Sequence, residues 1–307
     1  MKPVGFEYCR PESLPEALAL LQEFGAEASV LAGGMSLGAM LNMRLVRPAA
    51  VVDIKRLPGL DVIAVNGEIR TGATLRQAAA LEDAALMQFV PLLALALPHV
   101  GHFQTRNRGT LGGSVAHADP SSEIPLALLT LGGSVELQSK KGLRRVAAKD
   151  FFLGILTTER SADELLVALV WPKARPGAGC AFAEIAQRHG DFAIVACAAE
   201  AVLKPDGSLA HLAFGLGGVE SCPLLFDASA YLGKRAGPEL AEEIAGAAAR
   251  KVEPTSDFKA TAQYRRALVE ALGARVLADA FADAKVADAR IAGARAGARF
   301  AGARPQA

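Results

Sequence analysis

The 307-residue sequence has few cysteines, and none of them lies close to another. Cys9, Cys180, Cys197 and Cys222 include no C-x-x-C pair. Iron–sulfur clusters and structural zinc sites need several thiolates that converge, and such sites usually show as tight cysteine spacings. We therefore expect this chain to carry no cluster and no structural metal, so that any electrons from a metal centre must come from another polypeptide.

The sequence also lacks a strong net charge and a long apolar run. It has 33 Lys and Arg residues against 32 Asp and Glu residues, so it offers no basic field for nucleic acid. Its longest apolar runs, such as residues 193–199, are far shorter than the roughly 18 residues that a membrane helix needs. The N-terminus, MKPVGFEYCRPESL, lacks the apolar core of a secretory signal. We expect a cytoplasmic globular protein with no nucleic-acid partner and no membrane span.

Glycine, by contrast, is abundant, and the first glycine pair lies where a strand should meet a helix. Gly33 and Gly34 follow the apolar run 28–31 and precede Ser36, within LAGGMSLGAMLNMR at 31–44. Glycine lets the backbone approach a ligand without a Cβ atom in the way, and free N–H groups of a turn or helix start can bind an anion. The stretch favours a diphosphate site, although a plain strand-to-helix turn capped by Ser36 explains it equally well.

A second glycine pair favours the phosphate interpretation. Gly112 and Gly113 lie between the hydroxyl groups of Thr110 and Ser114, in RNRGTLGGSVAHADPSSEIP at 106–125. Backbone N–H groups and hydroxyls suit phosphate oxygens, and a carboxylate suits sugar hydroxyls. Two carboxylates follow in the same stretch, Asp119 and Glu123. Because neither stretch has the spacing G-x-G-x-x-G, we expect a fold other than the Rossmann fold, in which two loops close on one dinucleotide.

Hydrophobic periodicity divides the chain into three folded units and a tail. Residues 1–57 show a strand–helix–strand pattern that would hold the first glycine pair, and residues 58–174 mix strands and helices. After a linker rich in proline and glycine, residues 178–282 show two alternating runs and then helical periodicity, which indicates an antiparallel sheet covered by helices. Residues 283–307 are rich in Ala, Gly and Arg, and we expect a frayed helix or a partly disordered arm there.

Local signals place individual elements within these units. Asn66 and Gly67, between two alternating runs, indicate a hairpin with a type I′ turn. Capping-box patterns that begin at Ser13 and Thr74 predict helix starts. The other strands are expected at 28–31, 51–54, 133–138, 143–146, 165–170, 194–203 and 209–215. The later helices are expected at 91–97, 239–250 and 261–280.

Four motifs, in order along the chain, resemble one known family. AGGMS at 32–36 and the stretch at 106–125 resemble the two FAD loops of the medium, flavin-carrying subunit of molybdenum hydroxylases, the relatives of carbon monoxide dehydrogenase and xanthine dehydrogenase. RHGDFAI at 188–194 and YRRAL at 264–268 also look like that family. The resemblance spans roughly residues 3–280, and four short motifs in the expected order are far more specific than any one of them.

The resemblance implies an α+β fold. Residues 1–57 and 58–174 would be the two lobes of a vanillyl-alcohol-oxidase-type (PCMH) FAD-binding domain, and residues 178–282 a C-terminal domain of antiparallel sheet and helices. It also implies non-covalent FAD as the cofactor, with molybdopterin and [2Fe–2S] clusters only on partner subunits. FAD carries the redox chemistry itself, so no catalytic residue and no metal ligand is expected in this chain.

By position in the family motifs, a set of residues should surround the flavin cofactor. They are Ala32, Gly33, Gly34, Met35, Ser36, Thr110, Leu111, Gly112, Gly113, Ser114, His117, Asp119, Glu123, Leu156, Leu165, Asp191 and Phe192. Glu123 is a better candidate than Asp119 for the ribityl hydroxyls, although relatives often carry the shorter Asp there. A hydrogen-bonding or packing role suits His117. Phe192 would lie over the isoalloxazine ring and, lacking the hydroxyl of the Tyr in some relatives, would donate no hydrogen bond.

The resemblance further implies a role in a larger complex. A large subunit would oxidise the substrate at molybdopterin, [2Fe–2S] clusters of a small subunit would pass the electrons on, and FAD on this chain would deliver them to an external acceptor. The assembly would be a dimer of heterotrimers. Two alternatives stay open: a stand-alone FAD-dependent oxidoreductase, for which no acid or base beside the ring is evident, and a scaffold subunit that has lost FAD. The substrate and the acceptor do not follow from this sequence.

Overall fold

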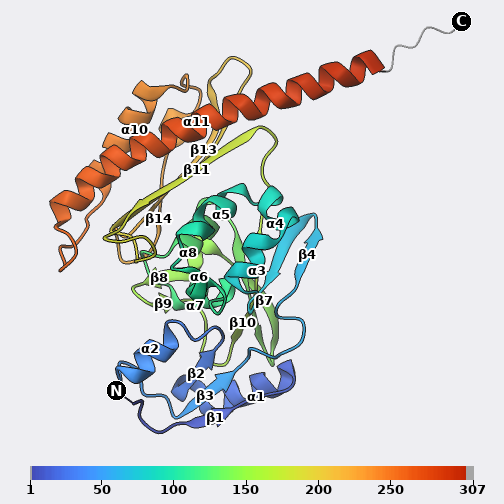
Figure 1. Ribbon diagram of the computed structural model, residues 1–307, viewed down its shortest axis with the longest axis vertical. Coiled ribbons are helices and arrows are strands. Elements are labelled where there is room, and N and C mark those ends of the chain that lie inside the picture. The colour runs from blue at the N-terminus through green and yellow to red at the C-terminus, as the bar shows by residue number, and fades with distance from the viewer. Residues whose placement is uncertain (1, 302–307) are drawn as a thin grey trace, which may run out of the picture.

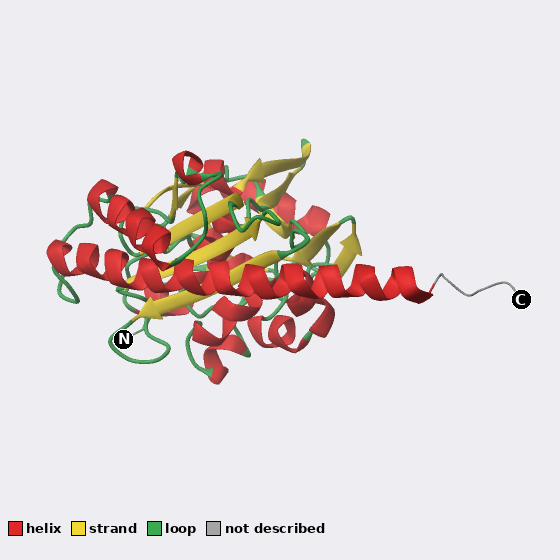
Figure 2. Ribbon diagram, turned by 90° about the horizontal axis from the view of Figure 1, so that it is seen from above, coloured by secondary structure: helices red, strands yellow, loops and turns green. Residues whose placement is uncertain are grey.

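The computed structural model describes the backbone of residues 2–301 and the side chains of residues 2–287. A three-stranded, a five-stranded and a four-stranded sheet follow one another along the long axis of the molecule, and a short two-stranded hairpin lies beside the second (Figure 1). The strands of the three large sheets fall within residues 7–53, 63–171 and 178–226, respectively. The arrangement is α+β, with helices between and over the sheets (Figure 2).

The N-terminal lobe is built on a parallel sheet in the order β1-β3-β2. Ser13 caps helix α1, because its Oγ accepts a hydrogen bond of 3.3 Å from the N–H of Glu16. The apolar face of α1, which includes Leu18 and Leu21, is buried in the core of this lobe. The elements are β1 (Glu7–Cys9), α1 (Leu14–Phe24), η1 (Gly25–Glu27), β2 (Ala28–Leu31), α2 (Leu37–Asn42) and β3 (Ala50–Asp53). The capped helix and the strand at 28–31 are as predicted.

The second lobe is an antiparallel sheet in the order β4-β5-β10-β6-β7, with short helices packed against it. Its strands are β4 (Ile63–Asn66), β5 (Glu68–Gly72), β6 (Ser134–Ser139), β7 (Gly142–Ala147) and β10 (Leu165–Trp171), with the small hairpin β8 (Phe152–Gly154) and β9 (Thr157–Thr158). Its helices are α3 (Gln77–Glu82), α4 (Ala84–Phe89), α5 (Pro91–Ala96), η2 (Leu97–His99), α6 (Phe103–Arg106), α7 (Leu111–His117), α8 (Glu123–Thr130) and α9 (Ala148–Phe151). The five strands of the large sheet lie where the periodicity predicted them.

Two local predictions in this lobe are wrong. The β4–β5 hairpin exists, but only Gly67 has a positive φ (76°), whereas a type I′ turn needs a positive φ at Asn66 too. The capping box at Thr74 also does not form: α3 begins two residues later, after Arg76, with no side-chain cap. Thr74 lies instead at a corner where its N–H donates to the carbonyl oxygen of Leu60, so tertiary contacts override the local signal.

In the C-terminal domain, helices cover one face of an antiparallel sheet and the second lobe covers the other (Figure 1). Helix α11 approaches β11 so closely that a Cβ atom on Gly179 would overlap the backbone of Ala284. On the opposite face, a Cβ atom on Gly215 of β13 would overlap the hydroxyl of Thr130 in α8. The elements are β11 (Ala178–Ile185), β12 (Val195–Leu203), β13 (Leu209–Gly217), β14 (Leu224–Phe226), η3 (Ser229–Tyr231), α10 (Pro238–Lys251) and α11 (Ala262–Ala301). Close packing on both faces joins this domain firmly to the second lobe.

Helix α11 is longer than the sequence pattern suggested. It continues to Ala301, so most of the expected tail 283–307 is the end of this helix, which projects beyond the rest of the molecule in Figure 1. Asp283, the first residue of that tail, accepts a hydrogen bond of 3.0 Å from the N–H of Cys180. Residues 302–307 lie outside the described part of the chain. Within residues 2–301, neither α11 nor any other helix is long and apolar enough to cross a membrane.

Candidate functional site

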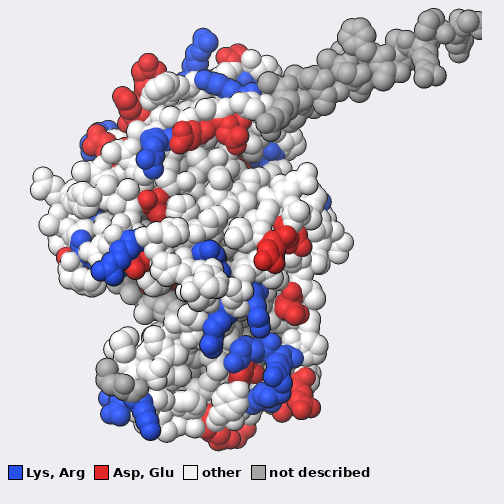
Figure 3. Space-filling model, in the orientation of Figure 1, with Lys and Arg blue, Asp and Glu red and all other residues white. Residues whose placement is uncertain are grey.

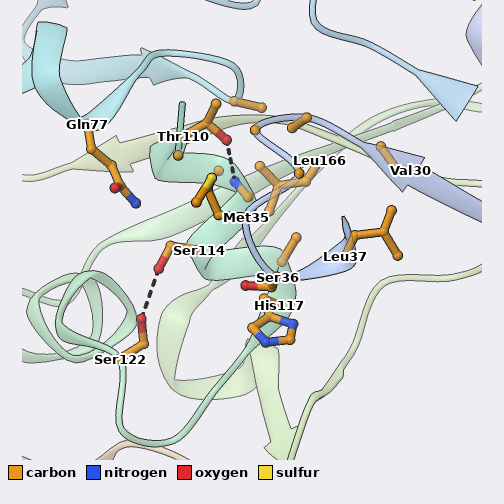
Figure 4. Close-up of a pocket in the computed structure, with 18 of the residues that line it drawn as sticks. Val30, Met35, Ser36, Leu37, Gln77, Thr110, Ser114, His117, Ser122 and Leu166 are labelled. Atoms are coloured by element: carbon orange, nitrogen blue, oxygen red, sulfur yellow. Dashed lines mark hydrogen bonds between the residues drawn. The ribbon is translucent and has the colours of Figure 1, made fainter. Parts of the chain in front are cut away.

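A cavity of about 510 Å³ lies between the N-terminal lobe and the second lobe. Figure 4 shows that β2 and the turn after it form one wall, and that α7 forms the opposite wall. On the face of the molecule shown in Figure 3, side chains of both charges occur over the two lobes, and the outline is indented between them. Of the sequence-predicted residues, the cavity is lined by Ala32, Gly33, Gly34, Met35, Ser36, Thr110, Gly112, Gly113, Ser114, His117, Glu123, Leu156, Leu165 and Phe192.

Three of the predicted residues do not line this cavity. Leu111 is fully buried in the hydrophobic core of the second lobe. Asp119 shapes the turn after α7, where its Oδ1 accepts a hydrogen bond of 2.8 Å from the N–H of Ser121. Asp191 lines a smaller, neighbouring cavity. The carboxylate that faces the main cavity is therefore that of Glu123.

The two glycine stretches touch each other. A Cβ atom on Gly33 would overlap the carbonyl oxygen of Arg108 and would lie 2.9 Å from the Cα atom of Gly109, so only glycine allows the two loops to come this close. Gly34 adopts a φ of 75°, in the left-handed region that favours glycine. The first glycine pair thus closes the contact between the loops and bends the chain around the cavity.

The turn after β2 presents a row of free backbone donors to the cavity. Within the described residues, the N–H groups of residues 32–37 donate no hydrogen bond. Ser36 occupies the cap position of α2 but makes no side-chain cap bond, which leaves its hydroxyl free as well. Six consecutive free N–H groups beside a cavity form a cradle for an anion.

The second glycine stretch works differently, because it is a helix rather than an open loop. In α7 the N–H of Gly112 donates to the carbonyl oxygen of Ala73 at 3.1 Å, and the N–H of Gly113 donates to Thr110 Oγ1 at 3.0 Å. The N–H of Ser114 donates to the carbonyl oxygen of Thr110 at 3.1 Å. We expected free backbone donors here, but the N–H groups at the start of α7 are already bonded to Thr110 and Ala73. A Cβ atom on Gly112 would lie 2.6 Å from the Cα atom of Ala73, so this glycine serves helix-to-strand packing.

Polar side chains supply the remaining hydrogen-bonding groups of the wall. Ser114 and Ser122 share a hydrogen bond of 2.9 Å between their hydroxyl oxygens (Figure 4). Gln77 is buried in the wall, and its Oε1 has no hydrogen-bond partner within the described part of the protein. Burial lowers the pKa of His117, against the opposing effect of nearby Asp119, so its imidazole is neutral at pH 7. The unpaired Gln77 amide is the kind of group that a ligand satisfies.

Glu123 is the one acidic residue among the described residues that line this cavity, and its pKa is strongly shifted. Its side chain is only 3% exposed, and burial, helped by the charges of Glu184 and Asp119, raises its pKa to about 8. At pH 7 the carboxyl group is therefore neutral and can donate a hydrogen bond as well as accept one. A neutral acid also adds no negative charge to a cavity that offers its free N–H groups to an anion.

Arg160 brings a positive charge to the cavity, and sequence reasoning missed it. Its Nη1 donates to the carbonyl oxygens of Ser161 and Glu164, at 2.9 and 2.6 Å. The nearby carboxylates of Glu159 and Glu164 are both held by Arg144. Burial lowers the pKa of Arg160, and the guanidinium nevertheless stays protonated at any physiological pH. The negative charges of Glu164 and Asp163 partly oppose the effect of burial on this pKa. Among the described residues Arg160 forms no ion pair, so its guanidinium can pair with a ligand.

Other lining residues also escaped the sequence-based prediction. They are Ala28, Ser29, Val30, Leu37, Met40, Ile54, Ala73, Gln77, Val100, Gly101, Thr105, Gly109, Ala116, Ser122, Leu166 and Gly190. Those that lie within the two glycine-rich stretches, such as Leu37 and Ser122, could have been found from their closeness to the predicted residues. Gln77 and Gly101 reach the cavity only through tertiary packing and carry no local signal.

Two family profiles together match nearly the whole chain. The family described as FAD binding domain in molybdopterin dehydrogenase matches residues 4–174. The family described as CO dehydrogenase flavoprotein C-terminal domain matches residues 180–280. The division between the two matches coincides with the start of the four-stranded sheet at β11.

Curated relatives match over almost their full length. Nicotine 6-hydroxylase medium subunit of Paenarthrobacter nicotinovorans is 36% identical over 285 residues, which cover 92% of this chain and 99% of the relative. Carbon monoxide dehydrogenase medium chain of Hydrogenophaga pseudoflava is 33% identical over 285 residues, with the same coverage.

Solved structures agree with these matches. A chain of carbon monoxide dehydrogenase from Hydrogenophaga pseudoflava superposes with a TM-score of 0.89 at 33% identity, covering 92% of this chain and 99% of that one. A chain of quinoline 2-oxidoreductase from Pseudomonas putida 86 superposes with a TM-score of 0.88 at 34% identity and the same coverage.

Proposed function

This chain belongs to the family of FAD-binding subunits of molybdopterin dehydrogenases, and from that premise we propose how its own residues hold FAD and serve electron transfer. It is the FAD-carrying oxidoreductase subunit of a molybdenum hydroxylase, with a two-lobed PCMH-type domain and a C-terminal domain. When bound, FAD supplies redox chemistry that can take up electrons one at a time and release them as a pair. The chain's part is to bind, orient and shield this cofactor.

The row of free N–H groups at residues 32–37 carries the proposal. A diphosphate is the anionic part of FAD, and this row is the strongest anion-binding feature of the cavity. Gly34 bends the row, and contact of Gly33 with the Arg108–Gly109 backbone holds it against the second lobe. The residues therefore fit the cofactor: the first loop binds the diphosphate through its backbone, and α7 closes the cavity from the other side.

The remaining wall suits the uncharged parts of FAD. Neutral Glu123 and the hydroxyls of Ser114 and Ser122 can bond ribityl oxygens, and the Gln77 amide can bond a polar ring edge. Leu156 and Leu165, together with Phe192, provide apolar surface for a planar ring. Neutral His117 serves as a hydrogen-bonding side chain and adds no charge.

We place the chain in a complex with a small iron–sulfur subunit and a large molybdenum subunit, because its relatives are named as medium chains or as subunits of a complex. We extend this to a dimer of such heterotrimers in the cytoplasm, in which FAD on this chain delivers electrons to an external acceptor. The relatives' names cite substrates as unlike as nicotine, caffeine and carbon monoxide, yet each relative matches this chain over nearly its whole length. The substrate must therefore be selected on the large subunit and not in this cavity.

Purification tests the proposed function. The chain expressed alone should be yellow and release FAD on denaturation, and chains that co-purify with it from its source should carry iron and molybdenum. Turnover of an organic donor by the chain alone would point to the stand-alone oxidoreductase instead. Folded, colourless protein that does not take up added FAD would point to a scaffold subunit.

Replacing Arg160 with glutamine should weaken FAD binding about tenfold, which corresponds to about 1.4 kcal/mol. The reason is the loss of a cavity cation that forms no ion pair within the described residues. The dissociation constant of FAD, measured by fluorescence titration of the apoprotein, checks this result. The difference between variant and wild type should shrink at high salt. Arg250→Gln, at an exposed position of α10, is the matched control and should leave the affinity unchanged.

Replacing Gly113 with valine should give folded but colourless protein. The Cβ atom at this position would lie 2.7 Å from Thr110 Oγ1 and 3.8 Å from the Cβ atom of Ala32, so the branched side chain fills the gap between α7 and the first loop. Loss of the Thr110 cap should cost only about 1 kcal/mol of stability. Absorbance of the flavin and circular dichroism separate the two effects, and stoichiometric FAD in this variant would refute the assignment of the loop.

A further inference from the structure

A second, smaller cavity of about 340 Å³ adjoins the flavin cavity, and the two share Gly190 and Phe192. Its lining is compact and mixes aromatic with polar groups: Gln187, Gly190, Asp191, Phe192, Phe258 and Lys259. Phe258 is 90% exposed, an unusual state for a large apolar side chain. Phe258, Lys259 and Gln187 do not line the flavin cavity.

The segment that presents Phe258 is rigidly built. Asp257 Oδ1 accepts hydrogen bonds of 2.9 Å from the N–H groups of Lys259 and Ala260, which ties the turn around Phe258. The guanidinium of Arg265 donates to Asp257 Oδ2 at 2.8 Å. The same guanidinium donates to the carbonyl oxygen of Ile194 at 2.5 Å.

Arg265 therefore joins the two motifs that the flavin cavity leaves unexplained. It belongs to YRRAL at 264–268, and Ile194 ends RHGDFAI at 188–194, the segment that carries Phe192. Arg265 itself is buried. One buried cation thus fixes the positions of both aromatic walls of the second cavity, which is how a binding site is preorganised.

We infer that this second cavity binds the electron acceptor, and that the acceptor is a quinone ring. This deepens the function proposed above and rests on it. The two phenylalanine rings offer stacking surface to a flat ring. Lys259 and Gln187 offer donors for the two carbonyl oxygens of a quinone.

The charge of Lys259 agrees with this occupant. Its ammonium lies 5.9 Å from the centre of the Phe192 ring, and within the described residues it takes part in no ion pair. A quinone that takes up two electrons gains negative charge on its oxygens until two protons neutralise it. The reaction balances when the reduced flavin gives up two electrons and two protons and one quinone leaves as the quinol.

A nicotinamide dinucleotide fits the second cavity less well. The cavity is smaller than the one that must hold FAD, another dinucleotide. Its one glycine, Gly190, is packed so that a Cβ atom would lie 2.9 Å from the backbone of Gly101, so its backbone already has a protein neighbour where a pyrophosphate would approach. The lining offers a single cation, whereas a pyrophosphate needs several donors.

Anaerobic stopped-flow of the FAD-loaded chain tests this inference. The chain is reduced with dithionite and mixed with tetramethylbenzoquinone, and flavin reoxidation should saturate with quinone concentration. Phe258→Ala and Lys259→Gln should each raise the half-saturating concentration at least about fivefold. Calorimetric titration of the oxidised chain, in which no electrons move, should show the dissociation constant of the quinone rising by the same factor in these variants.

Matched controls exist within the chain. Phe103 is another exposed phenylalanine outside both cavities, and Lys251 is another lysine over a phenylalanine ring, that of Phe226. Phe103→Ala and Lys251→Gln should change neither value.

Unchanged quinone binding in Phe258→Ala and Lys259→Gln would overturn the inference. Loss of the partner subunits from Phe258→Ala, at unchanged quinone affinity, would overturn it too and would make Phe258 a subunit contact. A chain without flavin absorbance would instead refute the proposed function, so the two failures are distinguishable.

Discussion

Replacing Gly33 with valine should abolish stable FAD binding and leave the three sheets folded. A side chain here would overlap the carbonyl oxygen of Arg108 and would lie within 3.0 Å of the adjoining backbone of Gly109, and backbone atoms cannot step aside. The two lobes must then separate, and the free N–H groups at residues 32–37 lose their position opposite α7. We expect FAD affinity to fall at least about 100-fold, or about 2.7 kcal/mol. Titration of the apoprotein with FAD measures the loss.

Gly38 provides the control for this variant within the same segment. A Cβ atom on Gly38 would meet nothing within 4 Å, and the residue lies in α2, where alanine is a better helix former than glycine. Gly38→Ala should therefore keep FAD and gain slightly in thermal stability. Strain from Gly33→Val should lower stability by about 1–3 kcal/mol, which circular dichroism would show as a lower melting temperature with unchanged secondary structure. Wild-type FAD affinity in Gly33→Val would show that contact between the loops is not needed.

Glu123→Gln should remove a large pH dependence from the apoprotein. Burial raises the pKa of Glu123 to about 8, whereas in the unfolded chain the value is near 4.5. Between these values the folded protein keeps the proton and the unfolded chain releases it. The free energy of unfolding therefore falls as pH rises through this window, by up to about 1.4 kcal/mol per pH unit, and levels off above pH 8.

The same proton controls cofactor affinity. Above pH 8 the carboxylate becomes charged in a cavity that binds an anion, so wild-type FAD affinity should fall by up to about tenfold per pH unit. Glu123→Gln mimics the neutral acid and should keep its affinity up to pH 9.5. Urea unfolding and FAD titration across pH 5–9.5 measure both effects. Glu242→Gln, exposed on α10, is the control, and a wild-type slope in Glu123→Gln would assign the pH dependence to another group.

Much of the fold was predictable because local and tertiary preferences agree. The strands β12 and β13 alternate between two packed faces over long runs, and Ser13 is a real helix cap. Strand β11 was missed because it begins in a glycine-rich run that reads as a linker. Its Gly179 is required by the close approach of α11, which is a contact between distant parts of the sequence.

The helix α7 was missed for a related reason. Its sequence, LGGSVAH, contains two adjacent glycines and has poor helix propensity. Tertiary contacts impose the helix: Thr110 caps it, and Gly112 is needed where it touches Ala73. Packing therefore decided this element against its local preference.

The site was predictable where short motifs carry it, and not elsewhere. The glycine pairs and the residues beside them mark both walls of the cavity. Arg160 and Gln77 are single residues in ordinary surroundings, and only the chain topology brings them to the cavity. Sequence also could not show which glycine stretch keeps its N–H groups free, because that depends on partners such as Ala73 in a distant segment.

Hydrogen exchange by mass spectrometry, with and without FAD, tests the central claim most directly. The amides of residues 32–37 are unpaired within the described chain, so they should exchange quickly in the apoprotein and slowly when FAD is bound. The amides of Gly112, Gly113 and Ser114 are already bonded and should change much less. Unchanged exchange at residues 32–37 in a chain saturated with FAD would contradict the account.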